Sequence, residues 1–230
     1  MIATEIAEGI HRVDGVRANV YLVIYNEELI MIDSGMPGNA DRILHYIDGI
    51  GYQPAAVSRI ILTHCHVDHA GSAKELKKRT NAKIAIHLED FDFVSGKKAF
   101  PKPEDMSGFQ YRISSPFLKT KLVTPDVTLQ DKDMIGRLTI IHTPGHTPGS
   151  VSVHDPEKGV LFVGDALSFF DGELRGPRLA VDASQEERSI EKISQLDFDI
   201  MLCGHGDPVK PDASEKVRQF LDTSRLRLKS

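Results

Sequence analysis

Residues 59–69 of the chain, Arg-Ile-Ile-Leu-Thr-His-Cys-His-Val-Asp-His, carry the most informative pattern in the sequence. The apolar run from Arg59 to Thr63 predicts a buried strand. The residues directly after it include three histidines and one aspartate. They are His64, His66, Asp68 and His69. A solvent-exposed polar turn rarely has this composition, so the segment is interpreted as a group of metal ligands.

The spacing within this group indicates ligands in two directions. Zinc binds imidazole nitrogen and carboxylate oxygen in compact shells of about four or five ligands. In an extended segment, side chains two positions apart point the same way, so His64 and His66 can hold one ion and Asp68 continues the alternation. His69 points elsewhere, which suits two adjacent metals better than one. Cys65 lies on the opposite side of the extended chain and is expected to be packed.

Three later residues also follow predicted strands. His146 lies in Thr-Pro-Gly-His-Thr-Pro-Gly (143–149), a rigid turn after an apolar run. Asp165 ends the run Leu-Phe-Val-Gly-Asp, and His205 follows Ile-Met-Leu-Cys-Gly. Single residues of this kind are usually structural. All three, however, lie where strands end, and α/β proteins gather their sites at that edge.

The order of predicted elements favours the α/β class. Strands are expected at residues 20–25, 28–32, 59–63, 83–87, 138–142, 150–154, 160–163 and 199–203, and helices at 39–50, 72–78, 185–196 and 213–226. This order suggests two stacked sheets with helices outside. Residues 95–120 lack periodicity and contain Phe100, Phe109, Tyr111 and Phe117. They are interpreted equally well as a lid over a binding site or as a surface excursion.

Length and composition limit the classes of function. A chain of 230 residues is expected to form a single domain over residues 1–230. The net charge of -5 argues against a nucleic-acid-binding surface, and no apolar run is long enough to span a membrane. Two cysteines imply no disulfide framework, and residues 1–9 do not resemble a signal peptide, so a cytoplasmic protein is expected. The oligomeric state stays open, and a homodimer is compatible with the sequence.

At this point the sequence resembles a known family, the metallo-β-lactamase superfamily. The motifs that carry the resemblance are residues 63–71, Pro-Gly-His-Thr-Pro-Gly-Ser (144–150), Val-Gly-Asp (163–165) and Gly-His-Gly (204–206). Together with Ile-Asp-Ser-Gly (32–35) they extend over nearly the whole chain. The resemblance implies a four-layer αββα sandwich of two mixed β-sheets flanked by helices, with the metals in a shallow cleft at one edge.

The resemblance also implies a role for each motif residue. His64, His66 and His146 would hold a first zinc ion, whereas Asp68, His69 and His205 would hold a second, with Asp165 bridging both. Iron or manganese are alternatives to zinc. Asp68 would also act in catalysis by holding the attacking water and passing on its proton. Asp33 matches a family aspartate that orients ligands from beneath the site, and a turn cap is an equal alternative.

The family resemblance predicts a binuclear zinc-dependent hydrolase that uses a metal-bridging hydroxide. The glyoxalase II-like and lactonase-like branch fits best, and the expected substrate is a small ester, thioester or lactone. Phe169 and Phe170 follow the bridging aspartate and are candidates for an apolar substrate pocket, with core packing as the alternative. Arg175 and Arg178 are near enough to Phe170 in sequence to meet an anionic end of the substrate, and solvation at the surface is the favoured alternative for both.

Two other functions are weighed against this one. One alternative is a mononuclear iron enzyme similar to persulfide dioxygenases. A non-catalytic zinc-binding module belongs to a different class, but structural zinc sites are closed and usually rich in cysteine. The histidine and aspartate ligands found here argue against such a module.

Overall fold

The computed structural model describes residues 4–104, 106–107, 122–176 and 179–228, with side chains up to residue 223. The chain divides into two compact units, which are described separately. Unit 1 comprises Met1–Pro101 with Ser107–Gln130, and unit 2 comprises Lys102–Met106 with Asp131–Ser230. The single domain expected for residues 1–230 stays a prediction.

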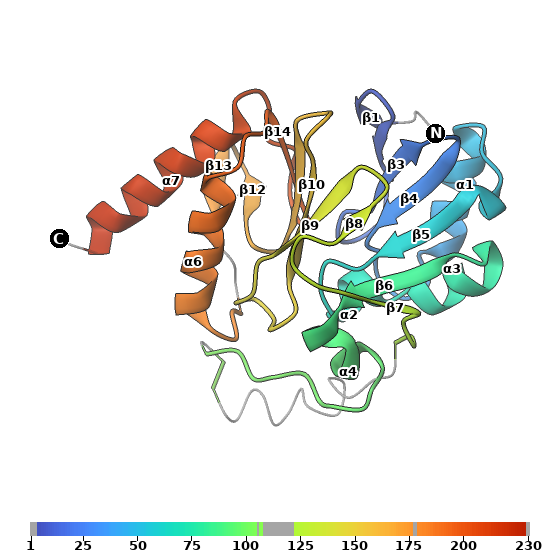
Figure 1. Ribbon diagram of the computed structural model, residues 1–230, viewed down its shortest axis with the longest axis horizontal. Helices are drawn as coiled ribbons and strands as arrows, with labels where there is room; N and C mark the ends of the chain where they lie inside the picture. The colour runs from blue at the N-terminus through green and yellow to red at the C-terminus, as the bar shows by residue number, and fades with distance from the viewer. Residues whose placement is uncertain (1–3, 105, 108–121, 177–178, 229–230) are drawn as a thin grey trace. The chain divides into compact units, whose positions relative to one another are not determined.

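Unit 1 is built on a seven-stranded mixed sheet (Figure 1). Its strands, in spatial as well as chain order, are β1 (Thr4–Ala7), β2 (Ile10–Arg12), β3 (Tyr21–Tyr25), β4 (Glu28–Ile32), β5 (Val57–Ile61), β6 (Lys83–His87) and β7 (Val127–Leu129). The first four pair antiparallel, and β4 to β7 pair parallel. The turn between β3 and β4 has positive φ at Asn26 and Glu27, as in the tight turns that favour β-hairpins.

The helices of unit 1 bury apolar side chains against this sheet. They are α1 (Ala40–Gly49), α2 (Val67–Ala70), α3 (Ala73–Thr80) and α4 (Phe91–Val94), with short 3₁₀ turns η1 (Pro54–Ala56) and η2 (Leu88–Asp90). Helix α1 buries Ile43, Leu44 and Ile47, the helical spacing seen in the sequence. These side chains join residues such as Leu22 and Ile60 of the strands in one apolar core. Burial of this core stabilises the sheet. The segment that follows β5, residues 64–69, is called the histidine loop.

Unit 2 is built on a five-stranded mixed sheet with the spatial order β14-β11-β10-β9-β8. The strands are β8 (Met134–Ile135), β9 (Leu138–His142), β10 (Val151–Asp155), β11 (Val160–Gly164) and β14 (Ile200–Cys203). Only β11 and β14 pair parallel. A separate hairpin consists of β12 (Ser168–Phe170) and β13 (Glu173–Arg175).

Two helices complete unit 2, α6 (Ala183–Ser194) and α7 (Ala213–Leu228). Asp182 caps α6, since its Oδ1 accepts a hydrogen bond from the Gln185 backbone N–H at 2.8 Å. Ile190 and Ile193 of α6 and Val217 of α7 pack with Leu161 and Met201 of the sheet. This core lies beside the carboxyl ends of β11 and β14, which carry Asp165 and His205.

The long elements match the sequence expectations to within a few residues, whereas short ones were missed. Strands β1, β2, β7, β8, β12 and β13 and helix α4 have two to four residues each. Elements this short contain too few side chains to show a hydrophobic periodicity in the sequence. The short strands form because they pair with a neighbouring strand. The two mixed sheets and the α/β class are confirmed.

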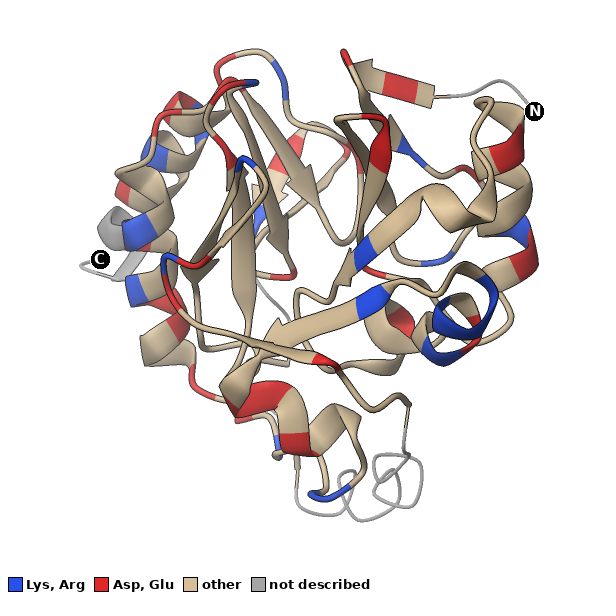
Figure 2. Cartoon of the chain, turned by 45° about the vertical axis from the view of Figure 1, so that its right-hand side comes forward, with Lys and Arg blue, Asp and Glu red and all other residues tan. Residues whose placement is uncertain are grey.

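Charged residues of unit 1 form local pairs. The basic residues of α3 are coloured blue in Figure 2, and the side chains of two of them contact acidic groups. Lys77 Nζ lies 2.7 Å from Asp126 Oδ1, and Arg79 pairs with Asp41 and Glu75. The basic cluster of α3 is therefore partly neutralised. Among the described residues, no helix has the length and apolar character needed to cross a membrane.

The interior strand β11 provides a test of burial in unit 2. Phe162 is 1% exposed, so Phe162→Ala should lower the free energy of unfolding by about 3–5 kcal/mol through lost burial and a residual cavity. Urea unfolding measures this change. Met134→Ala is the control, because Met134 is 66% exposed and its loss should change stability by less than about 0.5 kcal/mol. Equal midpoints for the two variants would contradict the burial of Phe162.

Candidate metal centre

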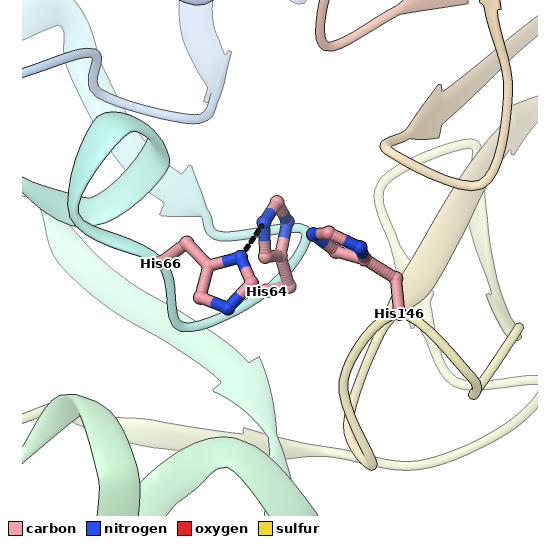
Figure 3. A group of neighbouring side chains, drawn as sticks. All are labelled: His64, His66 and His146. Carbon is pink, nitrogen blue, oxygen red and sulfur yellow. Dashed lines mark hydrogen bonds between the residues drawn. The ribbon is translucent and has the colours of Figure 1, made fainter. Parts of the chain in front are cut away.

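The histidine loop of unit 1 follows β5 and leads into α2. His64 Nε2 lies 3.1 Å from His66 Nδ1, so these two rings converge as the sequence predicts (Figure 3). The rings of His64 and His69 are also close, with centroids 4.1 Å apart. The expected extended alternation through Asp68 is wrong. His66 has an extended backbone, but helix α2 begins at Val67, so Asp68 and His69 lie on a helical turn.

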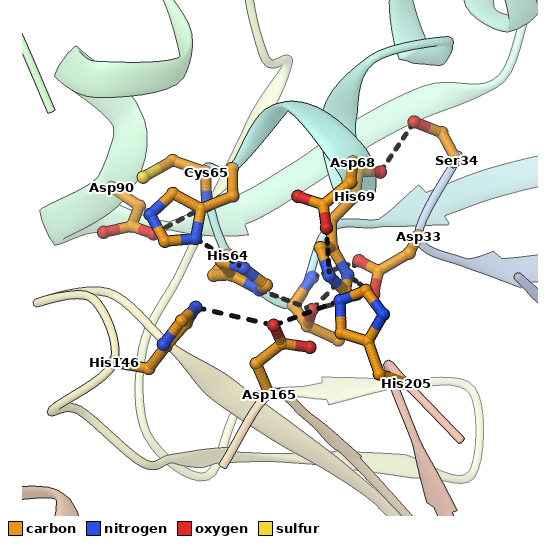
Figure 4. A network of polar contacts seen from close by, with 12 residues as sticks. Asp33, Ser34, His64, Cys65, Asp68, His69, Asp90, His146, Asp165 and His205 are labelled. Atoms are coloured by element: carbon orange, nitrogen blue, oxygen red, sulfur yellow. Dashed lines mark hydrogen bonds and ion pairs between the residues drawn. The ribbon is translucent and has the colours of Figure 1, made fainter. Parts of the chain in front are cut away.

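Asp33 lies beneath this loop and holds it through three donors. The Thr63 backbone N–H donates to Asp33 Oδ1 at 2.7 Å, and the Thr63 hydroxyl donates to Oδ2 at 2.8 Å. His69 Nδ1 lies 2.7 Å from the same Oδ2 (Figure 4). Asp33 is 2% exposed and has a φ of 61°, an uncommon value for a residue other than glycine. The carboxylate of Asp33 accepts from Thr63 and His69, which are distant in sequence, and from no neighbouring backbone group of the described chain as a turn cap would.

These contacts assign the protons of the histidine rings. A carboxylate accepts only, so His69 Nδ1 carries the hydrogen that faces Asp33 and the lone pair lies on Nε2. His69 Nε2 lies 3.8 Å from Asp68 Oδ2. In the same way, the Thr63 hydroxyl uses its hydrogen on Asp33, so its oxygen accepts from His64 Nδ1 at 3.1 Å. Both Nε2 atoms then present lone pairs, as metal ligation requires.

Unit 2 brings together three of the predicted ligands. Asp165 follows β11, His205 follows β14, and His146 lies in the turn between β9 and β10. His146 Nε2 and His205 Nε2 lie 3.6 and 3.4 Å from Asp165 Oδ2 (Figure 4). Two imidazole nitrogens therefore face one carboxylate oxygen.

Two glycines allow the backbone contacts that position these side chains. A Cβ on Gly145 would lie 2.4 Å from Glu186 Cα, and a Cβ on Gly206 would lie 2.0 Å from the Phe169 carbonyl oxygen. The chain therefore packs α6 directly on the turn before His146, and strand β12 directly on the residue after His205. Both glycines also have positive φ, which favours glycine on its own.

The donor sets within each unit fit a divalent metal ion. Two ligands on a tetrahedral zinc, each about 2.0–2.1 Å from the ion, lie roughly 3.3 Å apart. The pair in unit 1, His64 and His66, has its nitrogens 3.1 Å apart, and the two pairs in unit 2 measure 3.4 and 3.6 Å. Imidazole with carboxylate is the donor chemistry of zinc, iron and manganese sites.

Glu186 of α6 is a further residue of this region that the sequence analysis missed. It is 2% exposed, and neither carboxyl oxygen has a hydrogen-bond partner among the residues that the structure describes. Burial raises the pKa of Glu186 to about 9, and the negative charge of Asp165 adds to the increase. A signal was present in the sequence, because Glu186 is a charged residue four and seven positions before Ile190 and Ile193, on the apolar side of the helix.

The predicted substrate residues occupy different environments. Phe169 lines a cavity of about 400 Å³ within unit 2, whereas Phe170 is 39% exposed with the Arg175 guanidinium 5.7 Å from its ring centroid. Phe100 is buried in the unit 1 core, with its ring 5.9 Å from that of His66. Phe109, Tyr111, Phe117 and Arg178 lie outside the described residues, as does most of the expected lid.

Several other residues with polar or thiol side chains make structural contacts. Cys65 is buried in the unit 1 core, and burial raises the pKa of its thiol well above the ordinary value. The Ser34 hydroxyl donates to the His69 carbonyl at 2.7 Å. The remaining histidines contact nearby groups, His142 the Pro148 carbonyl, His154 the Asp197 carbonyl, His11 the Tyr46 hydroxyl and His87 the Glu89 backbone N–H.

A family model described as the metallo-beta-lactamase superfamily matches residues 13–205, which include all seven predicted ligands. The chain belongs to this superfamily. Its members generally bind metal ions, and the relatives identify it as a superfamily of metallo-hydrolases. The resemblance inferred from the sequence motifs is confirmed.

Similar proteins of this superfamily include several hydrolases. A probable metallo-hydrolase of Bacillus subtilis, YflN, is 31% identical over 89% of this chain and 86% of the relative. The acyl-coenzyme A thioesterase MBLAC2 of Bos taurus is 28% identical over 83% and 74%, and the hydroxyacylglutathione hydrolase GloC of Haemophilus influenzae is 29% identical over 84% and 87%. Similarity to GloC agrees with the glyoxalase II-like branch.

The solved structures confirm the metallo-β-lactamase fold. A metallo-beta-lactamase family protein from Thermus thermophilus superposes with a TM-score of 0.76 at 20% identity, covering 98% of this chain and 82% of that protein. At this identity the similarity concerns the fold alone.

Asp33→Asn tests the carboxylate beneath the histidine loop. Asparagine keeps the size of the side chain and tolerates positive φ, so the variant isolates the loss of an acceptor and of charge. The metal-free variant should lose about 1–3 kcal/mol of unfolding free energy, because one donor to Asp33 stays unsatisfied. Zinc affinity should fall about 10- to 100-fold as His69 loses its orientation. Chemical unfolding and chelator competition measure the two effects, and unchanged values in both would refute this role.

Proposed function

We propose that the chain is a binuclear zinc-dependent hydrolase of a small ester, thioester or lactone. The proposed ligands are His64, His66 and His146 for one ion, and Asp68, His69 and His205 for the other, with Asp165 between them. The convergence of His146 and His205 on one oxygen of Asp165 carries the proposal, because a carboxylate between two metals needs a ligand for each ion beside it. The donor atoms of the proposed ligands also support it, because their distances within each unit, 3.1 Å in unit 1 and 3.4 and 3.6 Å in unit 2, are close to those between two ligands of one zinc ion.

The two ions would supply hydroxide from water near neutral pH and a Lewis acid for the developing negative charge of the substrate. The protein residues have separate tasks. Asp33 and Thr63 fix the histidine tautomers, so that both Nε2 lone pairs stay available. The Asp68 side chain is 30% exposed, which leaves its carboxylate accessible to water and substrate. Asp68 therefore suits the role of accepting the proton of the attacking water and passing it to the leaving group.

Among the three substrate classes, thioesters have the most support. Two relatives are named as an acyl-coenzyme A thioesterase and a hydroxyacylglutathione hydrolase. The cavity of about 400 Å³ in unit 2 has a mixed lining, with apolar Phe169, Leu174 and Phe220 beside the polar or charged side chains of Glu173, Lys216, Gln219 and Thr223. Its size is in the usual range for small-molecule sites. The Asp207 backbone N–H donates to the Phe169 carbonyl at 2.9 Å, which places this wall next to the His205 loop.

Metal analysis of wild type and Asp165→Ala tests the proposed centre. Wild type should contain about two zinc-like ions per chain, because seven ligands exceed what one ion of about four or five ligands can use. Asp165→Ala should retain less metal and lose at least roughly a thousandfold in kcat/KM, since the metals supply several kcal/mol of transition-state stabilisation. Full activity and full metal content in the variant would refute the assignment. A single iron with oxygen-dependent activity in wild type would favour a dioxygenase.

An acyl-chain series tests the substrate pocket. Phe169→Ala should lower kcat/KM for long acyl thioesters by roughly 10- to 100-fold, in line with about 1.5–3 kcal/mol for burial against a large apolar side chain, and should affect short chains little. Phe170→Ala should have a smaller effect, because Phe170 is 39% exposed. The measurement is kcat/KM against chain length for the three proteins. Identical profiles would exclude both phenylalanines from substrate binding.

A further inference from the structure

Glu186 occupies a position where an apolar residue is expected. It lies in the first turns of α6, on the side that buries Ser189, Ile190 and Ile193. Buried glutamates are rare unless they are paired or bind a metal. The residue therefore requires an explanation that the core packing of unit 2 does not supply.

The backbone around Glu186 is fixed on the turn that carries His146. The Val181 and Asp182 N–H groups donate to the Gly145 carbonyl at 2.8 and 3.0 Å, and the Ser189 hydroxyl donates to the Pro144 carbonyl at 2.6 Å. Glu186 itself packs against Gly145, where only the absence of a Cβ allows the contact. The Glu186 side chain thus begins beside the residue that precedes a proposed ligand.

The carboxyl group of Glu186 has no hydrogen-bond partner in the described part of the chain and is close enough to Asp165 to be affected by its charge. An ionised Glu186 carboxylate would lack the stabilisation that water gives and would also be repelled by the charge of Asp165. A divalent cation removes both penalties, because it is the largest local charge in a site of this kind.

We propose that Glu186 is an additional carboxylate of the metal centre, acting on the cation near His146 and Asp165 through a water molecule. This inference rests on the proposed metal site. It adds an outer carboxylate from α6 to the seven ligands that the sequence motifs supply. The competing explanation is a permanently protonated acid that only fills space in the core.

Glutamine and alanine at position 186 separate these explanations. Glu186→Gln keeps the shape of a protonated acid without the ability to become an anion, and Glu186→Ala keeps only the Cβ that packs against Gly145. Glu187→Gln is the matched control, because Glu187 is the next residue of α6 and is exposed, so it makes the same chemical change outside the core. Zinc affinity is measured by competition with a chelator, and each metal-free protein is unfolded in urea.

Both position 186 variants should bind zinc about 10- to 100-fold more weakly than wild type, the usual effect of removing a group that supports a metal. Glu187→Gln should bind as wild type does. The zinc-induced rise in the unfolding midpoint should also be smaller for the two variants than for wild type, each compared with its own metal-free form.

The outcomes distinguish this inference from the proposed function. If wild type itself binds no metal, the proposed function fails together with the inference. If wild type binds zinc and both position 186 variants match it in affinity and in the zinc-induced midpoint shift, Glu186 is a core acid and only the inference fails. A loss confined to stability of the metal-free protein, with zinc affinity unchanged, also overturns the role at the metal.

Discussion

The histidine loop of unit 1 depends on the Asp33 carboxylate. This one group accepts hydrogen bonds from the Thr63 backbone, the Thr63 hydroxyl and His69 Nδ1, and it does so at the end of β4 with a left-handed backbone. Because β4 and β5 are parallel neighbours, their carboxyl ends meet at one edge, and Asp33 lies under the loop that leaves β5. The buried charge fixes the tautomer of His69 directly and that of His64 through Thr63. Without the Asp33 carboxylate, the His64 and His69 rings would lose the defined direction of their Nε2 lone pairs.

In unit 2, close backbone packing fixes the positions of the ligand histidines proposed there. Gly145 and Gly206 bring α6 and β12 to within contact distance of the chain beside His146 and His205. Such contacts leave no space for adjustment, because protein interiors are as dense as organic crystals. The convergence of two imidazoles on Asp165 Oδ2 is therefore a property of the backbone as much as of the side chains.

Negative charge is concentrated beside these histidines. Asp33 and Asp68 contact His69 in unit 1, and Asp165 lies near Glu186 in unit 2. Buried or half-buried carboxylates at this density are stable only with protons, hydrogen-bond donors or cations nearby. Asp33 has donors, whereas Asp68 and Asp165 face ring nitrogens and Glu186 has no hydrogen-bond partner in the described part of the chain. A cation beside the carboxylates of each unit would compensate their negative charge, which links the electrostatics of each unit to metal chemistry.

The sequence by itself determined the superfamily, the α/β class, the long strands and helices, and the identity of the motif residues. Those features depend on local periodicity and on motifs whose members are near each other in the chain, as in residues 63–71. The tertiary structure decided that Asp68 and His69 lie on a helical turn, because helix α2 begins at Val67 and a four-residue helix has no period of its own. It also placed Glu186 next to Gly145 and Asp165. No local pattern can reveal that neighbourhood, since burial and charge interactions between residues far apart in sequence exist only after the chain has folded.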